Sequence, residues 1–175
     1  MTSYKKATLT DDEKDSIALF TSLLVRYPEL CSLNYCPSQN FLKLIFIFQG
    51  NLKKSFLEKF SDELITCVHT FLYFEKKEIP RHISINYDYE PELTRIIITR
   101  DVNTLTQKEI SLIIKLLHLY FKNLLLSEGK TFLADEEILL QDDYIKYMLE
   151  SLQPQNFKNK IIALRENGRV LIFKQ

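Results

Sequence analysis

The apolar and polar positions divide this chain into segments with helical spacing and segments with extended spacing. Apolar residues at intervals of three and four predict three long helices, over about 11 to 26, 54 to 77 and 106 to 126. Thr10 is followed three residues later by Glu13, and Thr106 by Glu109, so the first and third helices begin with the sequence of a capping box. These two helices therefore have defined starts as well as an apolar face.

Between the helices lie short apolar or alternating runs that are separated by turn residues. They predict two β-hairpins, built from residues 31 to 36 with 41 to 48 and from 83 to 89 with 93 to 100. Each hairpin is followed by a long helix, so the order helix, hairpin, helix, hairpin, helix predicts an α+β fold. We expect an antiparallel sheet that is covered by helices.

The two hairpin-helix units, about 30–78 and 82–128, also resemble each other in sequence. An offset of 52 places Ser32-Leu33-Asn34-Tyr35 on Ser84-Ile85-Asn86-Tyr87. Any two amphipathic units of this kind share apolar positions, however. Internal duplication and a repeated order without common descent therefore both remain open.

The C-terminal extension, 130–175, predicts a further helix and a hairpin. A helix from about 142 to 152 would place four apolar residues on one side: Ile145, Met148, Leu149 and Leu152. Apolar runs then flank Asn167-Gly168, a strong hairpin signal. A competing interpretation makes 155 to 166 a helix with Gly168 near its C-cap. At 175 residues the whole chain, 1–175, is expected to form a single domain.

Composition and charge narrow the classes of partner. Lys and Arg number 23, as do Asp and Glu, so the net charge is zero and there is no overall field to attract nucleic acid. The apolar run 41–48 contains Lys43 and is far shorter than the roughly 20 residues of a membrane span. Three cysteines without paired spacing indicate reduced thiols, and the polar N-terminus is unlike a secretory signal. A soluble, cytoplasmic protein is expected.

The sequence contains no recognisable catalytic, metal-binding or phosphate-binding motif. The three glycines lie at element ends, and the three histidines have no carboxylate or cysteine at metal or triad spacing. The sequence therefore predicts no catalytic residue, no metal site and no cofactor. If distant residues assemble a site, the charged turn between the second pair of strands is the first place to look: Asp88, Glu90, Glu92, Arg95 and Arg100.

Alternation along the strands predicts an unusual outer face of the sheet. Three isoleucines point away from the core together with two asparagines: Ile45, Ile47, Ile97, Asn34 and Asn86. This face is either an interaction surface or is covered by residues 130–175. The helix over 106 to 126 has a second apolar stripe that includes Leu112, Leu116 and Leu119. That stripe indicates either a central helix of the monomer or a dimer contact.

These patterns predict a non-enzymatic cytosolic protein that acts through protein contacts, as an adaptor, chaperone-like or regulatory module. The candidate interaction surface consists of the two residue groups just named, and the expected partner is another protein or a second copy. The alternative is a small-molecule-binding domain or enzyme with a pocket between helices and sheet.

Overall fold

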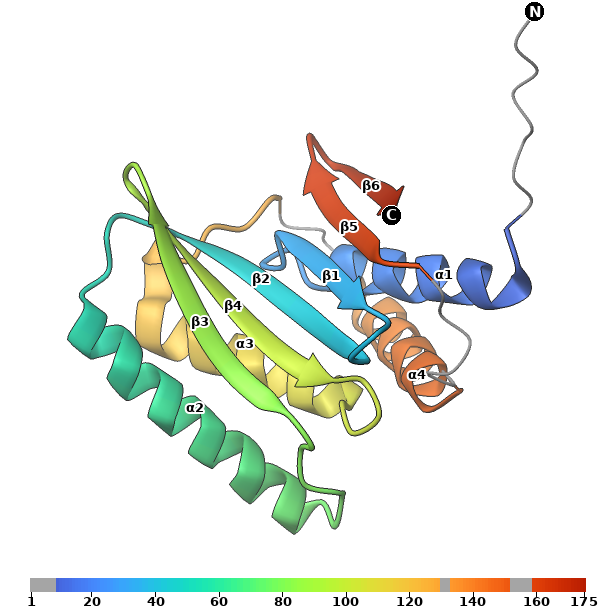
Figure 1. Ribbon diagram of the computed structural model, residues 1–175, viewed down its shortest axis with the longest axis horizontal. Coiled ribbons are helices and arrows are strands. Elements are labelled where there is room, and N and C mark those ends of the chain that lie inside the picture. Colours follow the sequence, from blue (N-terminus) through green and yellow to red (C-terminus); the bar gives the residue numbers. More distant parts are fainter. Residues whose placement is uncertain (1–8, 130–132, 152–158) are drawn as a thin grey trace, which may run out of the picture.

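A computed structural model describes residues 9–129, 133–151 and 159–175 (Figure 1). Within these ranges the helices are α1 (Asp11–Arg26), α2 (Lys54–Phe74), α3 (Gln107–Phe121), the short 3-10 helix η1 (Lys122–Leu124) and α4 (Asp135–Ser151). The strands are β1 (Ser32–Cys36), β2 (Phe41–Gln49), β3 (Ile83–Glu90), β4 (Leu93–Asp101), β5 (Ile161–Glu166) and β6 (Arg169–Lys174). No helix in these ranges has the length and apolar character needed to cross a membrane.

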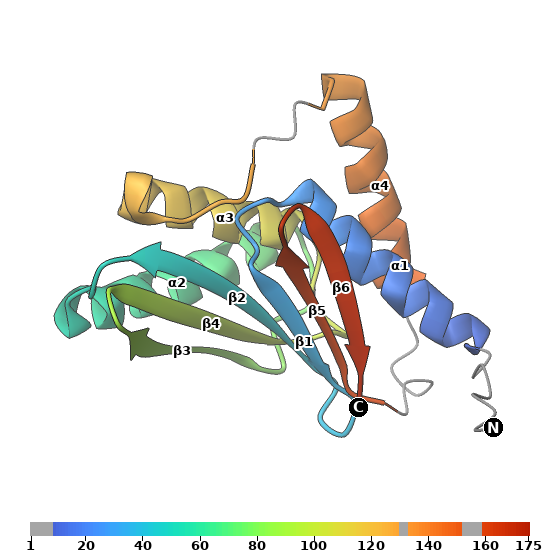
Figure 2. The same cartoon turned by 90° about the horizontal axis from the view of Figure 1, so that it is seen from above.

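The strands form one antiparallel sheet in the order β3-β4-β2-β1-β5-β6. The two predicted hairpins pair with each other through β2 and β4, which match along nine residues. All four α-helices lie on the same side of the sheet, with α4 outermost against α1 (Figures 1 and 2). The predicted α+β class and the repeated order of hairpin and helix are confirmed, while internal duplication stays a prediction.

The core lies between the sheet and the helix layer. Its strand residues come from alternate positions, such as Leu33, Leu44, Phe46 and Ile98, all closed to solvent. This is the face that alternation along the strands predicted to point inward. The helices contribute one apolar stripe each, and the stripe on α3 consists of Ile110, Ile113, Ile114, Leu117 and Phe121.

The third helix is shorter than predicted, because α3 ends at Phe121 and not near residue 126. Lys122 takes a backbone φ of 47°, which turns the chain out of the helix. Leu125 then pairs with Phe48, and the backbone N–H of Leu126 donates to the Ile47 carbonyl. The end of β2 after Ile45 has no partner on β1. Leu125 and Leu126, which periodicity alone assigned to a helix, pair with this part of β2 instead.

The C-terminal hairpin is confirmed, and the competing helix over 155–166 is wrong for 161–166, which form β5. Asn167 and Gly168 both have a positive φ, as the tight turn of a two-residue hairpin requires. The hairpin adds β5 to the edge of β1 and so extends the sheet sideways. The helix before it, α4, begins at Asp135, seven residues earlier than predicted, and Leu152 lies outside the described residues.

The N-terminus of α1 is joined to the end of β6. Thr10 and Glu13 form the complete predicted capping box. The Glu13 carboxylate also pairs with the Lys174 ammonium group and accepts from the Asn159 amide. The Lys174 bond and the Thr10 backbone N–H lower the pKa of Glu13 from 4.5 to about 2.

Acid should weaken this junction in a defined pH window. A carboxylate with a lowered pKa stabilises the folded chain above about pH 4.5, and the contribution disappears as the pH falls toward 2. We therefore expect Glu13→Gln to be less stable than the natural chain at pH 6 and equal to it at pH 2. Urea denaturation at the two pH values measures this, and a pH-independent difference would contradict it.

Candidate functional site

The sheet face opposite the helices, called the open face here, has the predicted set of outward residues. In the register, Ile45 lies between Ile97 on β4 and Ser32 on β1, and Lys43 lies between Thr99 and Asn34. None of the helices or strands in the described ranges packs on this face (Figure 2). Of the C-terminal extension, the described strands β5 and β6 do not cover this face, because β5 pairs with β1, β6 pairs with β5, and both extend the sheet sideways.

The C-terminal hairpin enlarges the apolar part of this face. Ile162 and Leu164 on β5 pair with Asn34 and Ser32, so they share the open face with them. Their β6 partners, Phe173 and Leu171, lie on the same face. We call the resulting set the apolar band: Ile45, Ile47, Ile97, Ile162, Leu164, Leu171 and Phe173.

The apolar band is separate from the core. None of its members belongs to the core cluster or packs against it, although Ile45, in the middle of the sheet, is only 8% exposed. Phe173 at the sheet edge is 48% exposed. The uncovered face of an antiparallel sheet is usually polar. Seven large apolar side chains thus lie on a face that is polar in most antiparallel sheets.

Polar and charged side chains border the apolar band. On β4, the Arg95 guanidinium donates two hydrogen bonds of 2.8 and 2.7 Å to the Asp88 carboxylate on β3. Asn34 has a buried Oδ1 with no hydrogen-bond partner in the described chain. Lys43 and Asn86 are exposed.

The predicted stripe on α3 is largely used inside the molecule. Leu116 packs against the core, Leu112 is half-buried, and only Leu119 is mostly exposed, at 68%. This happens because α3 lies between α2 and α4. The two groups of the predicted surface therefore lie on opposite layers: the isoleucines and asparagines on the open face, and the leucines among the helices.

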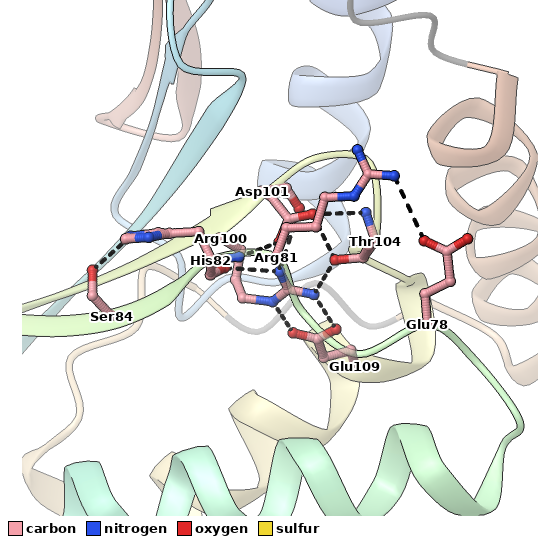
Figure 3. Close-up of polar contacts among 8 residues, drawn as sticks. All are labelled: Glu78, Arg81, His82, Ser84, Arg100, Asp101, Thr104 and Glu109. Atoms are coloured by element: carbon pink, nitrogen blue, oxygen red, sulfur yellow. Dashed lines mark hydrogen bonds and ion pairs between the residues drawn. The ribbon is translucent and has the colours of Figure 1, made fainter.

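The charged turn predicted as a place for an assembled site is divided between the two faces of the sheet. Arg95 lies on the open face with Asp88, whereas Arg100 points into the protein and is completely closed to solvent. Its Nε and Nη2 atoms donate to the Glu109 carboxylate at 2.5 and 2.9 Å. Its Nη1 atom pairs with Asp101 and donates to the His82 carbonyl at 3.0 Å (Figure 3).

Asp101 completes this buried cluster. Its carboxylate accepts from the backbone N–H of His82 at 3.0 Å and from the Thr104 hydroxyl at 2.6 Å. Burial opposes the charge, but the hydrogen bonds from Thr104 and His82, together with Arg100, hold the pKa of Asp101 below its usual value. The cluster links the ends of β3 and β4 to the first turn of α3.

The buried cluster also changes the predicted cap of α3. Thr106 accepts from the Glu109 backbone N–H at 3.2 Å, which is half of a capping box. The other half is absent because the Glu109 side chain binds Arg100. With Arg100, Glu109 and Asp101 at most 3% exposed, no substrate can reach these groups. Their arrangement is that of a structural ion-pair network.

Cavities lined by described residues outside the sheet-helix core include the following two. One of about 240 Å³ is enclosed by the loops at 28–31 and 126–128 and by Ile47 and Arg165. The other, about 430 Å³, is an open groove among the α2, α3 and α4 side chains. In the first, burial raises the pKa of the Cys31 thiol, which keeps it protonated at neutral pH. Across the described segments no three metal-ligating side chains come together.

Sequence reasoning missed the four band residues on β5 and β6. A signal was present, because Ile161 to Leu164 and Val170 to Phe173 are apolar at both alternating positions. A strand with two apolar faces needs cover on both sides. Comparisons of this chain with protein-family models, curated proteins and solved structures found no match.

Proposed function

We propose that this protein is a non-enzymatic interaction module that acts through protein contacts, and that a second copy of the chain occupies its open face. The observation that carries the proposal is the apolar band, which crosses the sheet without cover from the described helices and strands. Burying such a band removes apolar surface from water, which is the main driving force of protein association. Three unpaired cysteines support a reducing compartment such as the cytoplasm.

The size and charge of the chain suit self-association. Six strands at spacings of ~4.8 Å, each about seven residues long, give the open face a plane of roughly 500 Å². Side-chain relief adds to this plane, so the face approaches the roughly 800 Å² that each partner buries in a standard interface. The net charge of zero leaves no overall repulsion between two copies. Two-fold dimers are the commonest closed oligomers.

Polar substitutions within the apolar band should weaken the dimer. We expect Ile97→Thr and Leu164→Thr each to raise the dissociation constant at least about tenfold, because the loss occurs in both copies. Threonine keeps the strand preference of the position, so the sheet should still form. Analytical ultracentrifugation over a range of protein concentrations measures the effect.

Leu119→Gln is the matched control, since Leu119 is the exposed residue of the α3 stripe. It should leave the dissociation constant unchanged. A monomer at every concentration, or a dimer that Leu119→Gln disrupts and Ile97→Thr does not, would refute the proposal. Thermal unfolding followed by circular dichroism shows whether each variant is folded.

A further inference from the structure

Read from each edge of the open face inward, the charges occur in opposite order: negative then positive at the β3 edge, and positive then negative at the β6 edge. Residues that lie opposite one another on neighbouring strands form rows across the sheet. One such row on the open face consists of Ile97, Ile45, Ser32, Leu164 and Leu171, and the row next to it includes Ile47. This row begins on β3 and β4 with Asp88 and Arg95, negative then positive. On β5 and β6 it ends with Glu166 and Arg169, again negative then positive. Glu166 and Arg169 have no ion-pair partner in the described chain, and both are exposed.

A two-fold axis parallel to the strands would place the charges of one copy opposite charges of the other sign in the second copy. If the axis lies between β1 and β2, the second copy places its β3 over β6 and its β4 over β5, because the strand order is reversed. Asp88 of one copy then faces Arg169 of the other. Arg95 faces Glu166 in the same way, and the symmetry repeats both pairs.

The remaining rows fit the same axis. Ile97 of one copy lies opposite Leu164 of the other, so apolar residues meet in the centre of each half. Lys43 lies opposite Asn34, whose Oδ1 has no partner within the described chain and can accept from an ammonium group. An axis across the strands would instead place Lys43 opposite Ile47, which would bury a charge against an apolar side chain.

The twist of the sheet is compatible with this arrangement. A two-fold axis along the strands carries a twisted sheet onto a surface of the same twist and hand. Two such sheets can therefore nest face to face about 10 Å apart, as in β-sandwiches.

On these grounds we infer that the dimer is a face-to-face sandwich about this axis, with its register set by the pairs Asp88–Arg169 and Arg95–Glu166. The inference rests on the proposed function, and it names the arrangement of the second copy. Charges at such a rim mainly select the register and exclude others.

Exchanging the signs of the charges at positions 88 and 169 tests the arrangement. Arg169→Glu and Asp88→Arg should each raise the dissociation constant at least about tenfold, since each places like charges opposite one another. The double variant D88R/R169E should return to within about threefold of the natural chain, because it restores opposite charges with the signs exchanged. Lys115→Glu, the same change of charge on α3, is the control and should have no effect.

Sedimentation of the four variants separates the outcomes. Failure of the double variant to recover, with the dimer still sensitive to Ile97→Thr, would overturn this arrangement and leave the proposed function standing. A monomeric natural chain would overturn both. Since Asp88→Arg also adds a charge beside Arg95 within one copy, Arg169→Glu at the exposed edge of the sheet provides the test if the other variant does not fold.

Discussion

Replacing Arg100 by methionine is expected to lower the free energy of unfolding by about 4 to 5 kcal/mol. Methionine is apolar and flexible enough to fill much of the space, so the loss arises mainly from charge. Without the guanidinium group, the carboxylates of Glu109 and Asp101 remain buried together and repel each other. Urea denaturation at pH 7 measures the change.

A second substitution distinguishes this electrostatic effect from a packing defect. Adding Glu109→Leu removes one of the two uncompensated carboxylates and should recover a large part of the loss. The deficit of Arg100→Met should also shrink between pH 7 and pH 5. The uncompensated carboxylate of the folded state has a raised pKa, so it takes up a proton that the unfolded chain does not bind at these pH values. A deficit that neither Glu109→Leu nor acid reduces would contradict the charge argument.

Replacing Phe121 by alanine is the other substitution with a large expected effect, a loss of about 3 to 5 kcal/mol. Phe121 is 2% exposed at the end of α3 and contacts rings from two other elements. Its centroid lies 4.6 Å from that of Phe48 on β2, and 4.8 and 5.4 Å from those of Phe60 and Phe56 on α2. Truncation would therefore leave a cavity where three elements meet.

Phe74→Ala provides the matched control for this truncation. Phe74 ends α2 and is 76% exposed, so the same change should cost less than about 0.5 kcal/mol. Urea denaturation of the two variants gives the comparison. Equal losses at the two positions would show that the ring cluster does not hold α3 against α2 and β2.

The order of the elements and the inward face of each strand could be predicted from the sequence. Both depend on neighbours within a few residues: apolar spacing of two or of three to four, a cap such as Thr10, and a turn such as Asn167-Gly168. The outward position of Ile45, Ile47 and Ile97 follows from the same alternation. The isoleucine part of the candidate surface could therefore be predicted from strand periodicity alone.

Long-range contacts decided the remainder. Glu109 has the spacing of a capping residue, but Arg100 offers it a bidentate ion pair away from water, and the ion pair prevails. Likewise, helical periodicity continues beyond Phe121, yet the unpaired edge of β2 offers Leu125 and Leu126 backbone partners. In both places the local preference for a cap or a further helical turn is worth about 1 kcal/mol. Leaving the buried Arg100 or the backbone groups of β2 without a hydrogen-bond partner would cost more free energy.

The open face depends on both the local sequence pattern and the long-range packing of the chain. Sequence alternation determined which isoleucines leave the core, because that depends only on the pleat of each strand. Whether they remain uncovered depended on where the C-terminal hairpin packs, and pairing of β5 with β1 carried it to the sheet edge. That pairing joins residues more than 120 positions apart, which no local pattern encodes. The tertiary structure therefore added Ile162, Leu164, Leu171 and Phe173 to the face and placed Glu166 and Arg169 in the same row as Asp88 and Arg95.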